Sequence, residues 1–211
     1  MTYLVAVSQR VDKNNDRNEV RDMLDHRIVS FLTEVGAIAL PVPNNLPLSY
    51  RDRGSSASLE LFLKKTLPNA ILLTGGNDLG ECKERDSTEY LLLDYAEKLN
   101  LPVLGICRGM QLMAFRAGAT LSKVSRHVHS RHKVKGIISS EVNSYHNYAI
   151  KTCPKNYTVL AKTCDQTIEA IRHAWLPWEG WMWHPERECS FVREDIERAR
   201  LILKLATENY T

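Results

Sequence analysis

The most informative run in this chain is Leu101-Pro102-Val103-Leu104-Gly105-Ile106-Cys107-Arg108-Gly109-Met110-Gln111. A short apolar segment ends in Gly-Ile-Cys-Arg-Gly, and apolar residues at helical spacing follow at once. This order predicts a strand, a sharp turn and a helix, which is the layout of a nucleophile elbow. The glycines beside Cys107 permit the strained backbone that such a turn requires. Because the N-terminal end of a helix favours thiolate over thiol, we predict that Cys107 is a nucleophile.

Length and composition indicate one soluble α/β domain that spans residues 1–211. The net charge is only +3, which gives no electrostatic case for binding nucleic acid or a membrane. No apolar run approaches the roughly 20 residues of a membrane span, and residues 1–7 resemble a first strand more than a signal peptide. An odd number of cysteines without paired spacing favours free thiols in the cytoplasm (Cys82, Cys107, Cys153, Cys164 and Cys189).

The first half of the chain alternates between strand-like and helix-like segments. Strands are expected at 3–8, 37–42, 70–74 and 101–106, and helices at 19–35, 56–66, 87–99 and from 108 onward, with Ser87 as an N-cap and residues 9–17 and 44–56 as loops. Gly36 is placed to end the first helix. This alternation predicts parallel strands with helices on both faces. Function collects at the C-terminal edge of such a sheet, where Gly75-Gly76 and Cys107 both follow strands.

The second half has a different character. Closely spaced strand-like segments are expected to add antiparallel strands (119–124, 133–139, 148–150, 157–163, 167–173 and 180–183). An amphipathic helix is expected over 192–209. No linker marks a second domain.

A thiol nucleophile needs a base and a group that orients the base. The run Trp181-Met182-Trp183-His184-Pro185-Glu186 supplies both, because His184 can accept the thiol proton and Glu186 can hold the imidazole in the correct tautomer. Acyl transfer also needs hydrogen-bond donors for the oxyanion. We assign these to the backbone N–H groups of Arg108 and Gly76.

Several motifs in this order resemble the class I glutamine amidotransferase-like proteins. They are Thr74-Gly75-Gly76-x-Asp78, Gly105-x-Cys107-x-Gly109 and His184-Pro185-Glu186, with weaker matches at 9–12, 142–146 and 168–171. The chain is most similar to the free-standing γ-glutamyl hydrolases of peptidase C26 type, which include bacterial γ-glutamyl-γ-aminobutyrate hydrolases. The resemblance covers nearly the whole chain. It implies a flavodoxin-like three-layer sandwich with a central, mostly parallel sheet and added antiparallel strands.

The resemblance also implies an activity. A cysteine-dependent hydrolase would cleave the γ-glutamyl amide bond of a small-molecule conjugate through a γ-glutamyl thioester on Cys107, releasing glutamate and an amine. The substrate's glutamyl part would be held by Gly75, Gln111, Ser144, Tyr145 and His146. No metal or organic cofactor is expected, and the oligomeric state is left open.

The leaving group is a separate question. The stretch Arg126–Lys133 is strongly basic, and Arg126, His129 and Arg131 are candidate contacts for an anionic leaving group. One branch resembling this chain handles γ-glutamyl conjugates of nucleotide-activated amines in surface-polysaccharide biosynthesis, and an amino acid such as γ-aminobutyrate is a further possibility. A solvated basic face explains the same residues equally well.

His127, His129 and His132 raise the question of a metal site. They lack an evident carboxylate or cysteine partner, and alternate histidines on an exposed strand explain them as well, so we predict no metal site. Three other functions stay open: a glutaminase subunit that supplies ammonia to a separate synthase, a non-catalytic regulatory or binding protein, and a DJ-1-like chaperone or redox protein.

Overall fold

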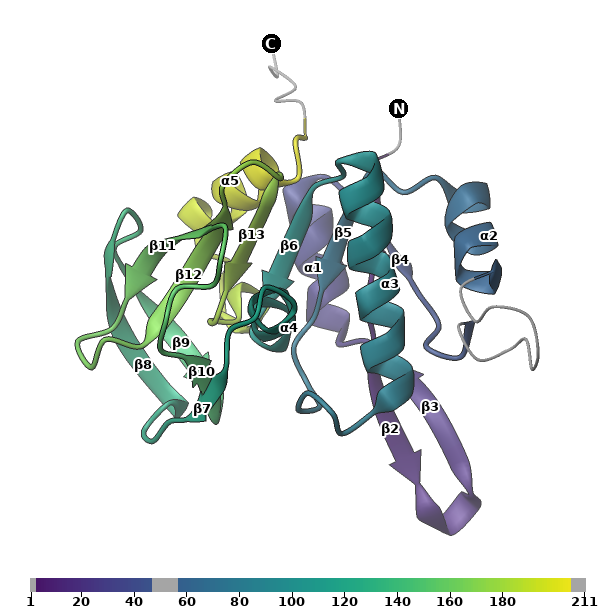
Figure 1. The fold of residues 1–211 in the computed structure, drawn as a ribbon, viewed down its shortest axis with the longest axis horizontal. Helices are drawn as coiled ribbons and strands as arrows, with labels where there is room; N and C mark the ends of the chain where they lie inside the picture. The colour runs from purple at the N-terminus through teal and green to yellow at the C-terminus, as the bar shows by residue number, and fades with distance from the viewer. Residues whose placement is uncertain (1–2, 47–56, 206–211) are drawn as a thin grey trace.

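The computed structural model describes residues 3–46 and 57–205, and its centre is a twisted sheet (Figure 1). The order of its nine strands is β4 (Ile38–Pro41), β1 (Leu4–Val7), β5 (Ala70–Leu73), β6 (Val103–Ile106), β13 (Trp178–Trp181), β12 (Ile168–His173), β11 (Tyr157–Lys162), β8 (Val128–Gly136) and β9 (Ser140–Tyr145). The strands from β4 to β13 pair in parallel, and those from β13 to β9 pair antiparallel. The predicted parallel sheet with antiparallel additions is therefore confirmed.

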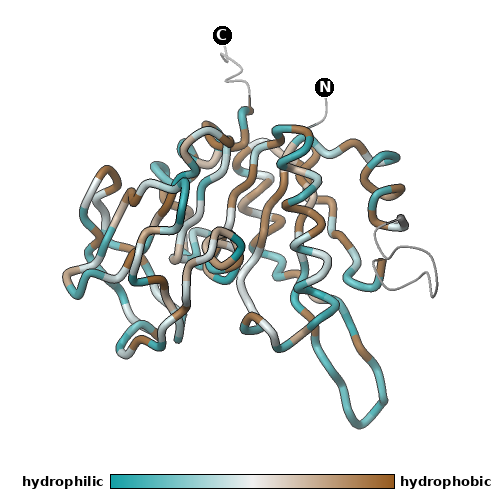
Figure 2. Tube along the Cα trace, in the orientation of Figure 1, coloured by the Kyte–Doolittle hydropathy of each residue, from teal (hydrophilic) through white to brown (hydrophobic). Residues whose placement is uncertain are grey.

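Helices cover both faces of the parallel half. Helices α1 (His26–Val35) and α5 (Arg193–Ile202) pack on one face, and α2 (Ala57–Thr66), α3 (Lys83–Leu99) and α4 (Arg108–Arg116) pack on the other. Successive residues of a strand pack against helices on opposite faces of the sheet: Val5 and Val7 face α1, whereas Ala6 faces α2 and α3. Figure 2 shows apolar residues along the central strands and along the helices that cover them. The three-layer, flavodoxin-like α/β sandwich is what the sequence predicts.

The N-terminal region corrects one prediction. The residues from 10 to 23, expected as a loop and the start of a helix, form a polar hairpin of β2 (Arg10–Asn14) and β3 (Glu19–Met23) that projects from the body (Figures 1 and 2). Val20 is 67% exposed, so its fit to a helical apolar face was accidental. The helix begins only at His26, because the side chain of Asp25 accepts a hydrogen bond from Arg27 N at 2.9 Å and caps it.

Further features of the structure differ from the sequence-based predictions. Helix α3 begins at Lys83 with Cys82 as N-cap, not at Ser87. The expected strand at 180–183 is β13, which runs parallel to β6 instead of antiparallel. Residues 140–145 form strand β9, and β7 (Leu121–Lys123) pairs with β10 (Tyr148–Ile150) in a separate small sheet. The expected final helix ends at Ile202, with Leu203 as its C-cap, and not at 209. Residues 206–209 of that expected helix and residues 47–56 of the expected loop lie outside the described residues.

Within the described ranges, 3–46 and 57–205, no helix is long and apolar enough to cross a bilayer.

Candidate active site

The elbow has the geometry that the glycines predict. Cys107 lies between β6 and α4 with φ 51° and ψ −104°, a strained conformation for a residue with a side chain. A Cβ on Gly105 would lie 2.8 Å from the backbone carbon of Gly109, and a Cβ on Gly109 would lie 2.4 Å from the carbonyl oxygen of Leu73. The close approach of strand and helix therefore requires glycine at both positions.

His184 and Glu186 follow β13, the strand beside β6, so sheet order brings them to Cys107. His184 Nδ1 lies 2.7 Å from Glu186 Oε1, which leaves Nε2 for the sulfur of Cys107. Burial of the imidazole lowers its pKa, but the charges of Glu186 and Cys107 and hydrogen bonds to both raise the pKa of His184 to about 9. The raised pKa favours an imidazolium beside the sulfur of Cys107, an arrangement that a cysteine nucleophile and its base would require.

Asn143 fixes the backbone of the histidine. Its Nδ2 donates to His184 O at 2.7 Å and its Oδ1 accepts from His184 N at 2.9 Å, while the same amide donates to Glu188 at 2.8 Å. Our sequence analysis gave Asn143 no role. Its position in the matched segment 142–146 was the available signal, but only the pairing of β9 with the chain after β13 shows what it holds.

The side chain of Arg108 is engaged in a buried ion-pair network. It is buried and forms ion pairs with Glu89 and Asp86, and Glu89 also accepts from Arg85 Nε at 2.9 Å. Arg85 in turn donates to the carbonyl of Thr74 at 2.7 Å. This network joins the elbow to the turn after β5. Arg108 therefore offers the site its backbone N–H, which has no intrahelical partner at the first position of α4.

A cavity of about 250 Å³ lies against the elbow. Its wall contains most of the predicted site residues: Gly76, Cys107, Arg108, Gln111, Tyr145, His146 and His184. Gly75 lies beneath the ring of His184 in an adjoining small pocket. Ser144 is buried outside the cavity wall, where its hydroxyl donates to His127 O at 2.6 Å.

Arg187 is a cavity residue that our sequence analysis missed. It follows the His-Pro-Glu motif directly, and its guanidinium carbon lies 4.7 Å from the ring centroid of Tyr145. Both side chains line the cavity. The basic stretch Arg126–Lys133 contributes less to the cavity, because Arg131 pairs with Glu141 and Glu188 outside the cavity wall.

The other two basic candidates lie toward the surface. Arg126 is exposed, with a φ of 65°. His129 is also exposed, and its ring packs edge-on against Tyr145 with centroids 5.2 Å apart. His129 therefore reaches the rim of the cavity through Tyr145, whereas Arg126 has no such link in the described part of the chain.

The structure corrects the expectation that the clustered histidines lack a carboxylate partner. His127 and His132 lie beside the buried carboxylate of Glu169, together with His146. His129 is not part of this group. The carboxylate was missed because it lies on β12, about forty residues along the chain, and only strand order brings it to the histidines.

Comparison with known protein families identifies the family to which the chain belongs. Residues 21–202 match the model of the family described as glutamine amidotransferase class-I. The chain belongs to the class-I glutamine amidotransferase family. Among its relatives is a protein of Campylobacter jejuni named gamma-glutamyl-CDP-amidate hydrolase, 35% identical over 152 residues, which are 68% of this chain and 71% of the relative. Another relative is a subunit of the glutamine-hydrolyzing GMP synthase of Pyrococcus abyssi, 28% identical over 82% of this chain and 89% of its own length.

Solved structures show the same fold. A protein of Thermoplasma acidophilum described as a GMP synthase subunit superposes with a TM-score of 0.66 at 22% identity, covering 97% of this chain and 94% of its own. A glutamine amidotransferase of Thermotoga maritima gives a TM-score of 0.63 at 15% identity, covering 97% and 90%. The chain therefore retains the family architecture over its described length.

Proposed function

We propose that the protein hydrolyses the γ-glutamyl amide bond of a small-molecule conjugate through a thioester on Cys107. The observation that carries this proposal is the strained elbow cysteine facing a buried His184, whose Nδ1 lies 2.7 Å from Glu186. A regulatory protein without activity has no chemical need for this arrangement. The relationship to a gamma-glutamyl-CDP-amidate hydrolase supports the same reaction class.

The reaction proceeds in two halves. The thiolate of Cys107 attacks the γ-carbonyl carbon, and the backbone N–H groups of Arg108 and Gly76 stabilise the oxyanion. The imidazolium of His184 gives its proton to the departing amine, and the C–N bond breaks to leave a thioester. His184 then accepts a proton from water, which attacks the thioester and releases glutamate and the free thiolate. Glu186 keeps the imidazole oriented throughout.

The charged side chains of the cavity wall fit a substrate that has a zwitterionic glutamyl group and an anionic leaving group. Asp78 and Glu81 offer carboxylates to the α-ammonium of the substrate, and Arg187 offers a guanidinium to a carboxylate or phosphate. We place Arg187 first among the leaving-group contacts, with His129 at the rim. Arg131 contributes least, because two glutamates already neutralise it. A nucleotide-linked amine is therefore the preferred leaving group, and γ-aminobutyrate the simpler one.

A glutaminase subunit is the second candidate. It is favoured by the similarity to the GMP synthase subunit from Pyrococcus abyssi, which extends over 82% of this chain. Such a glutaminase would release ammonia from glutamine, at a rate that rises when its synthase partner is added.

A substrate screen separates the two candidates. Glutamate release is measured for glutamine, γ-glutamyl amino acids, γ-glutamyl amines and a γ-glutamyl nucleotide conjugate, using wild type, Cys107→Ala and the control Cys164→Ala, which changes an exposed cysteine outside the cavity. We expect turnover of one conjugate that exceeds turnover of glutamine, is lost in Cys107→Ala and is retained in Cys164→Ala. Equal turnover in wild type and Cys107→Ala contradicts the mechanism, and activity on glutamine alone supports the glutaminase subunit.

A further inference from the structure

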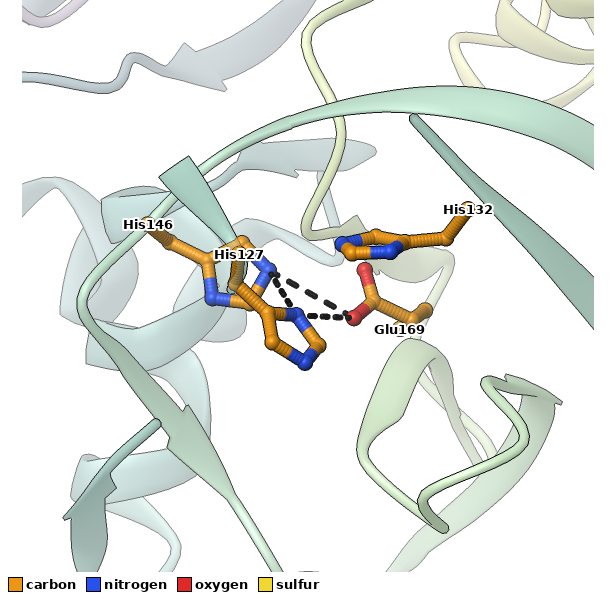
Figure 3. A group of neighbouring side chains, drawn as sticks. All are labelled: His127, His132, His146 and Glu169. Atoms are coloured by element: carbon orange, nitrogen blue, oxygen red, sulfur yellow. Dashed lines mark hydrogen bonds and ion pairs between the residues drawn. The ribbon is translucent and has the colours of Figure 1, made fainter. Parts of the chain in front are cut away.

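A second group of functional side chains lies in the antiparallel half of the molecule. Figure 3 shows His127, His132, His146 and Glu169 pointing toward one another. They come from the chain before β8, from β8 itself, from the end of β9 and from β12. One ligand atom from each lies within 4.8 Å of all the others, and His127, His146 and Glu169 are 3% exposed or less.

Hydrogen bonds on the outer side of two rings fix where their protons reside. His127 Nε2 lies 3.0 Å from Asp165 Oδ2, and a carboxylate accepts a hydrogen bond, so this nitrogen carries the proton. His146 Nδ1 lies 3.2 Å from the carbonyl oxygen of Tyr148, which also only accepts. In neutral rings the inner nitrogens, His127 Nδ1 and His146 Nε2, are therefore unprotonated. Outer partners of this kind are typical of histidines that bind metals.

The inner atoms are arranged as three electron-pair donors around one point. His127 Nδ1 and His146 Nε2 are 3.3 Å apart, and Glu169 Oε1 lies 3.5 Å and 3.4 Å from them. Three facing lone pairs repel one another unless a metal ion or a shared proton lies between them. A tetrahedral zinc ion with bonds of about 2.0–2.1 Å holds its ligand atoms about 3.3–3.4 Å apart. The observed separations match one face of such a tetrahedron.

Among the described residues, buried atoms of Glu169 and His132 without a hydrogen-bond partner are consistent with His132 as the fourth ligand. Neither oxygen of Glu169 forms a hydrogen bond of good geometry within the described part of the protein, and the Nε2 atom of His132 is likewise buried without one. Buried polar atoms normally have a partner, so each of these needs an explanation. His132 also lines the large groove beside β11, which gives an ion a route to the site.

We propose that His127, His132, His146 and Glu169 bind one divalent transition-metal ion of the zinc class. Three imidazoles and one carboxylate suit Zn²⁺, whereas Mg²⁺ and Ca²⁺ prefer oxygen ligands. Four protein ligands close the coordination shell, so the ion is structural. This inference departs from the sequence-based expectation of no metal, and it does not depend on the proposed reaction.

The proposed ion links His146, which belongs to the active-site cavity wall, to strands β8 and β12. His146 lines the cavity that contains Cys107, and its neighbour Tyr145 packs edge-on against His184 with ring centroids 5.7 Å apart. By fixing His146 to β8 and β12, the ion holds the end of β9 in place. It therefore positions the cavity wall without touching the reacting atoms.

The first test is metal binding by the wild-type chain, produced without a polyhistidine tag. Protein stripped with a chelator is titrated with Zn²⁺ alone, and separately with Co²⁺ while the visible spectrum is recorded. We expect one equivalent of Zn²⁺ per chain and the intense d–d bands of tetrahedral Co²⁺. A chain that binds no Zn²⁺ overturns the proposal and shows that a shared proton occupies the space. Co²⁺–thiolate charge-transfer bands also overturn it, because they assign the metal to a cysteine.

The second test compares variants by Zn²⁺ affinity, with far-UV circular dichroism to confirm the fold. Because outer partners alone are worth about 10–100-fold in affinity, Asp165→Asn should weaken binding by that factor, and Glu169→Gln and His132→Ala by at least as much. His26→Gln is the matched control, since His26 is an exposed histidine on α1 outside the group. Asp165 is half exposed, so its variant tests the site without disturbing the core. Unchanged affinity in all three cluster variants refutes the assignment.

Discussion

Adding one methyl group under the imidazole of His184, the proposed base, gives a sharp test of the active-site geometry. A Cβ on Gly75 would lie 2.5 Å from His184 Cε1, whereas ordinary contacts begin at 3.4 Å, so in Gly75→Ala the ring must retreat by about 0.9 Å. The ring is not free to do so, because Glu186 holds Nδ1 at 2.7 Å and Asn143 holds the backbone. Losing the charge-assisted hydrogen bond to Glu186 costs about 1.5–3 kcal/mol, which is about 10- to 150-fold in rate.

The assay is steady-state glutamate release, with kcat and KM measured separately and the melting temperature recorded. We expect kcat to fall by this factor, and we expect stability to fall by about the 1.5–3 kcal/mol of the broken hydrogen bond, with no added backbone cost because Gly75 is not among the glycines with positive φ. Gly36→Ala is the control: Gly36 ends α1 with φ 96° and open space around it. There we expect a loss of about 1–2 kcal/mol in stability and wild-type kcat. Wild-type kcat in Gly75→Ala would refute the close placement of His184.

Three further substitutions test the surroundings of the site. Glu186→Gln should lower kcat by about 100-fold or more, because orientation of the imidazole is lost. It should also lower the pKa of His184 from about 9, because the carboxylate charge favours the imidazolium. NMR titration of the imidazole measures this pKa. An unchanged pKa would contradict this cause. Asn143→Ala leaves the buried N–H of His184 unpaired, while the carbonyl of His184 keeps the hydrogen bond from Arg187 N at 3.0 Å. We expect a loss of about 1–3 kcal/mol in urea unfolding and a lower kcat. A stability equal to wild type would show that these bonds are replaced. Glu89→Ala should destabilise the fold by about 3–5 kcal/mol in the same assay, because it removes a buried carboxylate that forms an ion pair with Arg108. A loss under about 1 kcal/mol would mean that the network does not stabilise the fold.

The elbow could be read from the sequence because its geometry is local. A strand, a cysteine between glycines and a helix follow one another within a dozen residues, so steric rules alone predict the turn. The same holds for His184 and Glu186, which are two residues apart with a proline between them. The prediction for residues 10–23 failed because Val20 and Met23 fit a helical period, whereas the tertiary structure leaves both exposed and the helix begins at His26, capped by Asp25.

The sequence by itself determined the cysteine elbow, the His-Pro-Glu motif from which the nucleophile and base are proposed, the alternation of strands and helices, and the family likeness. Tertiary structure alone decided that Asn143 holds His184 and that the guanidinium of Arg108 is buried in ion pairs with Glu89 and Asp86. It also decided that Glu169 lies among histidines from two other strands. The physical reason is range: residues a few positions apart are placed by backbone geometry, whereas residues tens of positions apart meet only through strand order and register, which depend on how the whole core packs.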